Sequence, residues 1–166
     1  MKKMAFLVSG DASTPRHFVR NGLTPAVAIA YEACSAYTFA RSEHLYTHFI
    51  ERKDEVSHTR EVLRVLLEYE IELALMMGWE ASLDEEIFRE YKGEMLCSSL
   101  SPSLDRFDKR TAQEIICTIR FGPAGPKMGQ VAVRIGRGED IESFKDRVEE
   151  EQSELYFGIV RTLGGV

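Results

Sequence analysis

The sequence has few of the residues that build metal centres or disulfide frameworks. Its 166 residues include three cysteines and four histidines, and no two cysteines have the short spacing of a zinc or redox motif. We therefore expect no metal cofactor, and we interpret Cys34, Cys97 and Cys117 as reduced thiols of a cytoplasmic protein. No apolar run has the length of a transmembrane helix. The run after the N-terminal lysines is also too short for a signal peptide.

The chain also lacks an excess of positive charge. Its formal net charge is −6 at pH 7, which argues against nucleic acid or an anionic membrane as its partner. The acidic residues between positions 139 and 154 alternate with apolar ones and indicate the solvated side of a helix. A small-molecule ligand remains open as the partner. The oligomeric state also stays open, with a homodimer as one option.

What the sequence does contain is an alternation of short apolar runs with amphipathic stretches. Strands are predicted at residues 5–8, 27–31, 45–50, 71–77, 95–98, 115–121 and 130–135. Helices are predicted at residues 56–69, 83–91 and 141–163, the first capped by Ser57 or Thr59 and the last by Asp140. This order predicts one α/β domain over residues 1–166. Its sheet is mostly parallel and Rossmann-like, with an antiparallel addition at one edge.

A ligand crevice in such a sheet lies beyond the carboxyl ends of the strands. In this chain the relevant segments are residues 9–13, 77–80 and 97–102. Because parallel strands end at the same edge, these three loops are expected to meet at one site although they are far apart in sequence.

Six segments of the chain follow one another in a recognisable order. They are residues 6–14 (FLVSGDAST), 77–88 (MGWEASLDEEIF), 95–102 (MLCSSLSP), 116–121 (ICTIRF), 123–130 (PAGPKMGQ) and 147–157 (RVEEEQSELYF). In the phosphoribosylglycinamide formyltransferases the corresponding motifs are S-G-x-G-S-N, A-G-F-M-R-I-L-S-P-x-F, N-I-H-P-S-L-L-P, G-C-T-V-H-F, D-T-G-P-I-I-x-Q and R-V-x-x-x-E-x-x-L-Y-P. The chain thus resembles this folate-dependent formyltransferase family of purine biosynthesis over nearly its whole length, and it is shorter chiefly after Pro102. The resemblance implies a three-layer sandwich of the formyltransferase type, with 10-formyltetrahydrofolate as the cofactor.

The resemblance also implies which positions carry the chemistry. The family uses an Asn, a His two residues later and an Asp from a later loop, and the matching positions here are Met95, Cys97 and Pro123. Met provides no donor for an oxyanion and Pro has no ionisable group, so only the Cys97 thiol can exchange a proton. We expect a divergent member with a degenerate active site, weak or inactive in standard formyl transfer to an amine.

The ligand-binding positions are altered as well. The segment that matches the family's phosphate loop consists of Gly10, Asp11, Ala12, Ser13 and Thr14. Asp11 places a negative charge where a phosphate is expected, and this charge repels a phosphate. Arg16 and His17 would offset the repulsion if their side chains turned inward. An equally good interpretation is that Asp11 and Ser13 cap the following helix. The folate side of the cleft matches Met77, Gly78, Trp79, Glu80, Leu83 and Arg120.

Two alternatives stay open. One is an active formyltransferase with a rearranged site that uses Cys97, Glu80 or a histidine such as His17. The other is a non-catalytic binding or structural protein whose crevice is closed by Trp79, Met95 and Met128.

The histidines offer little support for a metal site. His44 and His48 are four residues apart, as in a helical zinc site, but the intervening residues do not follow the metalloprotease pattern. We expect all four histidines to be surface residues.

Overall fold

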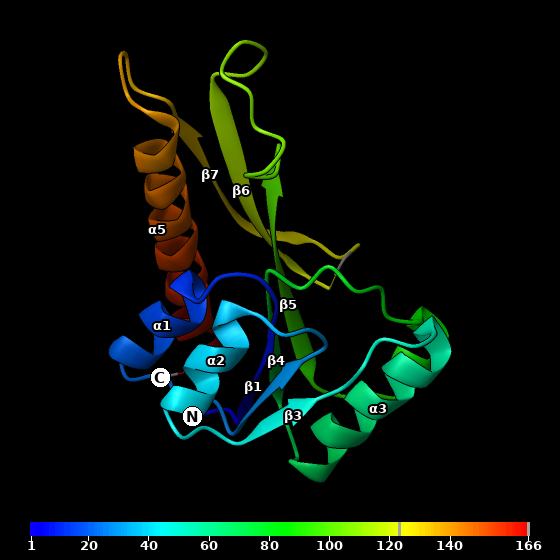
Figure 1. Cartoon of the computed structure of the whole chain (residues 1–166). Coiled ribbons are helices and arrows are strands. Elements are labelled where there is room, and N and C mark those ends of the chain that lie inside the picture. The colour runs from blue at the N-terminus through cyan, green and yellow to red at the C-terminus, as the bar shows by residue number, and fades with distance from the viewer. Residues whose placement is uncertain (123, 166) are drawn as a thin grey trace.

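The computed structural model describes residues 1–122 and 124–165. Its strands are β1 (Met4–Val8), β2 (Val27–Ala30), β3 (Thr47–Phe49), β4 (Leu73–Met77), β5 (Glu94–Ser101), β6 (Glu114–Phe121) and β7 (Lys127–Arg134). Its helices are α1 (Ser13–Arg20), α2 (Ser35–Ser42), α3 (Glu55–Glu68), α4 (Glu85–Phe88) and α5 (Ile141–Val160), followed by the π-helical turn η1 (Arg161–Gly165). Figure 1 shows their arrangement.

The strands form a single sheet in the order β3-β2-β1-β4-β5-β6-β7. The five strands from β3 to β5 pair in parallel, whereas β6 pairs antiparallel with both β5 and β7. The predicted fold class is therefore confirmed: an α/β sandwich with a mostly parallel sheet and an antiparallel edge. The two antiparallel strands extend beyond the rest of the sheet, and α5 lies along them (Figure 1).

Alternating side chains of the buried strands build the core on both faces of the sheet. On β1, Phe6 belongs to the cluster that packs under α1, α2 and α5, whereas Leu7 belongs to the cluster under α3. All five residues of β1 are buried, as expected for a parallel strand covered on both faces. A third cluster joins the start of α5, through Phe144 and Val148, to β6 and β7.

The helix boundaries differ from the prediction in ways that have local causes. The predicted Ser57 or Thr59 cap of α3 is wrong, because Asp54 accepts a hydrogen bond from the Ser57 amide at 2.9 Å. The predicted cap of α5 is confirmed, because Asp140 accepts from the Ser143 amide at 2.9 Å. The helix predicted at residues 83–91 shortens to α4.

Helix α2 is absent from the predicted elements. Its fully buried residues are only Ala36 and Ala40, and such small side chains give a weak apolar pattern. Among the described residues, no helix combines the length and apolarity that a membrane span requires.

Candidate functional site

A cleft of about 450 Å³ opens at the carboxyl ends of β1, β4 and β5. It is lined by Ser9, Gly10, Asp11, Gly78, Trp79, Glu80, Ser98, Ser99, Leu100, Ser103, Leu104, Asp105, Glu149 and Gln152. Strand β1 lies between β2 and β4 in the sheet, so the strand order reverses here, and such switch points are where α/β sheets bind ligands. The predicted meeting of three distant loops is confirmed.

A second cavity, of about 320 Å³, shares part of this lining. Its walls are Met76, Trp79, Glu80, Ala81, Ser82, Leu83, Cys97, Ser98, Ser99 and Arg120. Four residues line both spaces, namely Trp79, Glu80, Ser98 and Ser99. The two cavities therefore form one cleft with two ends. Arg120 is at the end near Cys97, and Asp11 and Glu149 are at the end near α1.

Gly78 allows the β1 and β4 loops to approach each other at the base of the cleft. Its φ is +67°, and a Cβ atom at this position would lie 2.7 Å from the carbonyl oxygen of Ser9. Glycine adopts this left-handed conformation without a steric cost, and only hydrogen fits in the remaining space. The identity of residue 78 therefore sets the shape of the site.

An aromatic wall bounds the cleft on the β2 side. The Trp79 ring lies 4.7 Å from the Tyr31 ring, edge to face, and stacks on the His58 ring at 5.7 Å between centroids. The Tyr31 hydroxyl donates to Ser9 Oγ at 3.2 Å and accepts from the Glu80 amide at 3.3 Å. This wall ties the ends of β1, β2 and β4 together.

His58 belongs to this wall and is buried instead of lying on the surface, so the expectation of four surface histidines is wrong. Only 2% of it is exposed. Burial, and to a smaller extent the charge of Arg52, lower the pKa of His58, while the Glu51 backbone acts in the opposite direction. His58 is therefore a neutral part of the wall at neutral pH.

The polar side chains of the expected phosphate loop are engaged within the chain. Asp11 accepts a hydrogen bond from the Ser13 amide at 2.7 Å, and the Ser13 hydroxyl donates to Glu149 Oε2 at 2.9 Å. Thr14 Oγ1 lies 2.9 Å from Ser153 Oγ. Because the Ser153 hydroxyl donates to the Glu149 carbonyl, Thr14 is the donor in its pair. Residue 12 is the N-cap, so neither Asp11 nor Ser13 occupies that position.

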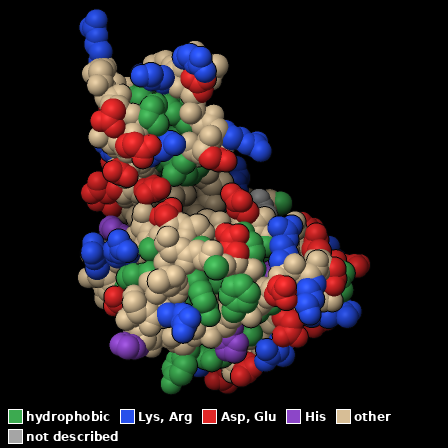
Figure 2. Space-filling view, in the orientation of Figure 1, with side chains coloured by type: hydrophobic (Ala, Val, Ile, Leu, Met, Phe, Trp, Pro, Cys, Tyr) green, Lys and Arg blue, Asp and Glu red, His purple; other side chains and the backbone are tan. Residues whose placement is uncertain are grey.

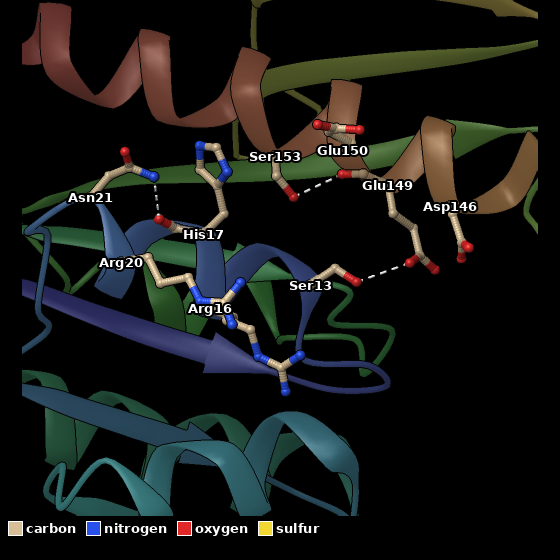
Figure 3. A pocket seen from close by; sticks show the side chains of 9 residues that line it. All are labelled: Ser13, Arg16, His17, Arg20, Asn21, Asp146, Glu149, Glu150 and Ser153. Atoms are coloured by element: carbon tan, nitrogen blue, oxygen red, sulfur yellow. Dashed lines mark hydrogen bonds between the residues drawn. The ribbon is translucent and has the colours of Figure 1, made fainter. Parts of the chain in front are cut away.

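Arg16 and His17 do not turn toward the cleft. They line a separate groove of about 330 Å³ between α1 and α5, which Figure 3 shows from close by. His17 packs edge to face on Phe157, with ring centroids 5.4 Å apart, and the Arg16 guanidinium lies 5.4 Å from the centroid of the Phe39 ring. Neither side chain offsets the charge of Asp11 in the cleft.

The end of the cleft near α1 is acidic. Its lining includes the carboxylates of Asp11, Glu80, Asp105 and Glu149, and none of the described residues that line it is Lys, Arg or His. Partial burial, followed by the charge of Asp11, raises the pKa of Glu149 above its ordinary value. In Figure 1 strands β6 and β7 and helix α5 extend together beyond the rest of the molecule. Figure 2 shows acidic side chains gathered around a hollow between this extension and the rest of the molecule.

The positions expected to carry catalysis lie on β5, except for Pro123, which lies outside the described residues. Met95 is 8% exposed and belongs to the core under α3. Cys97 points its Sγ to Met76 Sδ at 3.1 Å, and burial raises the pKa of its thiol to about 12. The thiol is therefore protonated at neutral pH and is not available as a general base.

The crevice is open, so the closure considered for a structural protein is not formed. Trp79 packs on Tyr31 and His58, and Met95 lies in the core. Met128, on β7, is 36% exposed and is not among the residues that line the cleft.

The sequence did not single out Glu149, although it lines both the cleft and the α1–α5 groove. It belongs to the run of acidic residues on α5, and nothing in the sequence distinguishes it from its solvated neighbours. Ser153, one turn later, is a buried polar residue on the same helix, but its role becomes apparent only with α1 in place.

A metal site has no support among the described residues. None of them form a group of three or more His, Cys, Asp or Glu side chains suited to hold a metal ion. His44 follows α2 with a φ of 56°, whereas His48 lies in β3 with its Nε2 3.2 Å from the Tyr69 hydroxyl. The two histidines therefore do not share a helix face.

Solved structures with the same architecture share little sequence with this chain. A phosphoribosylglycinamide formyltransferase from Streptococcus pneumoniae matches with a TM-score of 0.86 and 17% identity, over 98% of this chain and 99% of that one. One from Bacillus halodurans matches with a TM-score of 0.84 and 15% identity, over 98% and 95% of the two chains. A formyltetrahydrofolate deformylase from Pseudomonas putida matches with a TM-score of 0.80 and 15% identity, over 96% of this chain and 64% of that one.

Sequence comparison alone gives no relative. No protein-family model matches the chain, and no curated protein matches it either. The resemblance predicted from six short segments is thus confirmed at the level of three-dimensional structure. The chain has the fold of the phosphoribosylglycinamide formyltransferases.

Proposed function

We propose that this protein binds a folate-type ligand in the cleft and is weak or inactive in standard formyl transfer from 10-formyltetrahydrofolate to an amine. The observation that carries the proposal is the state of the two described catalytic positions. Met95 is a core residue, and the Cys97 thiol has a pKa of about 12. Neither provides the oxyanion donor or the acid–base group that formyl transfer requires.

The retained cleft supports the binding half of the proposal. Apolar and aromatic side chains, among them Met76, Trp79 and Leu83, line the cavity next to Cys97. Arg120 adds a positive charge to the same lining, which suits the carboxylates of a folate tail. Largely apolar pockets with a few polar groups are typical of small-molecule sites. The proposal includes a cytoplasmic location, which agrees with three free cysteines.

The direct test has a binding arm and a turnover arm. Calorimetric titration with 5-formyltetrahydrofolate is expected to give saturable binding, and Trp79→Phe should alter its enthalpy. Turnover of 10-formyltetrahydrofolate with glycinamide ribonucleotide should be at least about a thousandfold below that of the S. pneumoniae enzyme, because donor and acid–base losses are each worth two to three orders of magnitude. Turnover comparable to that enzyme would refute the lost-chemistry half, and the absence of binding heat would refute the folate half.

A restoring variant sharpens the turnover arm. Met95→Asn combined with Cys97→His returns the family's residues to β5, and with glycinamide, an amine acceptor that carries no phosphate, the double variant should form formylated product faster than wild type. Met95→Leu with Cys97→Ser is the matched control, since it changes the same positions without restoring either group. Equal rates in the two double variants would show that these positions do not limit the reaction.

One observation favours the alternative of an active enzyme with a rearranged site. Glu149 lines the cleft, and partial burial beside Asp11 raises its pKa above the ordinary value, which favours the protonated form that a general acid needs. In that alternative Glu149→Gln abolishes turnover while Cys97→Ala and His17→Ala leave it unchanged, because the thiol is protonated and His17 lies in the α1–α5 groove.

A further inference from the structure

The start of α1 is where a ligand phosphate is expected in a fold of this type, because the amides of a helix N-terminus favour anions. In this chain two of its own carboxylates already lie there. Asp11 accepts the Ser13 amide at 2.7 Å, and Glu149 accepts the Ser13 hydroxyl at 2.9 Å. A phosphate would have to displace both carboxylates before it could use these donors.

The surrounding charges oppose a phosphate as well. Glu80 and Asp105 complete a set of four carboxylates around this end of the cleft, and no described lining residue there is a cation. Two positive side chains on α1, Arg16 and Arg20, line the groove on the other side of Glu149. In Figure 3 Ser13 and Glu149 point toward each other, and the two guanidinium groups lie apart from this contact.

The aromatic wall completes a site for a group of the opposite charge. Trp79 lines the same cleft as the four carboxylates, and an indole ring beside carboxylates attracts an ammonium group more strongly than either does alone. Partial burial of Glu149 beside Asp11 leaves two like charges close together. A bound cation relieves this repulsion, whereas a bound anion adds to it.

We propose that Asp11 and Glu149 make this end of the cleft reject phosphorylated ligands and select a ligand that presents an amino group to it. The inference rests on the proposed function, since it names the charge of the ligand that the same cleft accepts. It assigns Asp11 and Glu149 a role in specificity and leaves the folate-type group to the end lined by Arg120.

Trp79 provides the test because it is the only tryptophan of the chain and lines the cleft. Its fluorescence is titrated with spermidine and with ribose 5-phosphate at the same ionic strength. Spermidine should bind wild type more tightly than ribose 5-phosphate. Its affinity should fall about threefold to tenfold in Asp11→Asn and in Glu149→Gln, since each variant removes one partly solvated charge contact. The double variant should gain affinity for ribose 5-phosphate.

Glu150→Gln is the matched control. It removes the same charge from the same helix, but Glu150 lines the α1–α5 groove and not the cleft, so spermidine affinity should stay within about twofold of wild type. A loss equal to that of Glu149→Gln would reduce the effect to non-specific attraction by an acidic protein and overturn the inference. Glu80→Gln removes an exposed carboxylate of the same cleft and leaves the Ser13 hydrogen bonds in place. It should therefore also lower the affinity for spermidine.

The remaining outcomes separate this inference from the proposed function. Tighter binding of ribose 5-phosphate than of spermidine to wild type overturns the inference and leaves folate binding unaffected. A failure of the double variant to gain affinity for ribose 5-phosphate also overturns it, because the carboxylates would then not be what excludes the phosphate. If wild type did not bind 5-formyltetrahydrofolate but still bound spermidine more tightly than ribose 5-phosphate, only the proposed function would be refuted.

Discussion

The Cys97 thiol lies at the position that the resemblance assigns to a catalytic group, and yet it has the environment of a core side chain. It lies 3.1 Å from Met76 Sδ, and burial raises its pKa from 9.0 to about 12. Thiolate, not thiol, is the reactive species. A shift of this size leaves roughly a thousandfold less thiolate at pH 8 than in the unfolded chain.

Alkylation measures this difference directly. In a Cys34→Ala, Cys117→Ala background, iodoacetamide at pH 8 should modify Cys97 about a thousandfold more slowly in the folded protein than in urea. Mass spectrometry of the modified peptide gives both rates, and the unfolded chain is its own control. A folded rate within about tenfold of the unfolded rate would mean that Cys97 is available as a thiolate.

Single residues also set the limits of prediction from sequence. Asp54 caps α3, but the apolar periodicity begins only at Val56, so the polar first turn of the helix gives no signal. Glu149 is indistinguishable from its acidic neighbours until α1 is packed against it. Asp140, by contrast, immediately precedes a long apolar pattern, and its capping role is predicted correctly.

At the scale of the element, the strand that ends at Gly78 determines how the cleft is built. Strand β4 consists of five buried residues, a run long enough and apolar enough to be predicted from the sequence. The close approach of its end to Ser9 was not predictable, because it depends on the pairing of β1 with β4 across a large sequence separation.

Replacing this glycine should destabilise the fold. Gly78→Ala forces an alanine to a φ of +67° and places its Cβ 2.7 Å from the Ser9 carbonyl oxygen. We expect the free energy of unfolding in urea to fall by about 2 kcal/mol or more.

Gly158→Ala is the control for this prediction. Gly158 lies inside α5 with a negative φ, and a Cβ there meets no atom within 4 Å. This substitution should therefore raise the free energy of unfolding by about 0.5–1 kcal/mol, the difference in helix propensity. Equal effects of the two substitutions would argue against the close contact between the β1 and β4 loops.

At the scale of the whole molecule, the sequence predicted the architecture better than the site. The order and spacing of the apolar runs indicate which strands pair in parallel and which edge of the sheet is antiparallel. This pattern is spread over many residues, so a few unusual positions do not obscure it. The charge of the cleft depends on four carboxylates from distant parts of the chain. Their convergence follows from packing, which no local pattern encodes.

The buried acids of the whole molecule also predict how its stability responds to alkaline pH. Burial raises the pKa of Cys97 to about 12 and that of Cys117 to about 11, and it raises the pKa of Tyr156 as well. Above the unfolded thiol pKa of about 9, the unfolded chain loses protons that the folded protein keeps, so the free energy of unfolding falls as pH rises.

The two thiols together should lower the free energy of unfolding by at most about 2–3 kcal/mol between pH 8 and pH 10, measured by urea unfolding at each pH. Cys97→Ala with Cys117→Ala should reduce this loss to below about 1 kcal/mol, because the two thiols whose pKa burial raises are then gone. An equally steep loss in the double variant would mean that other groups drive alkaline unfolding and that the Cys97 thiol is less shielded than its position beside Met76 implies.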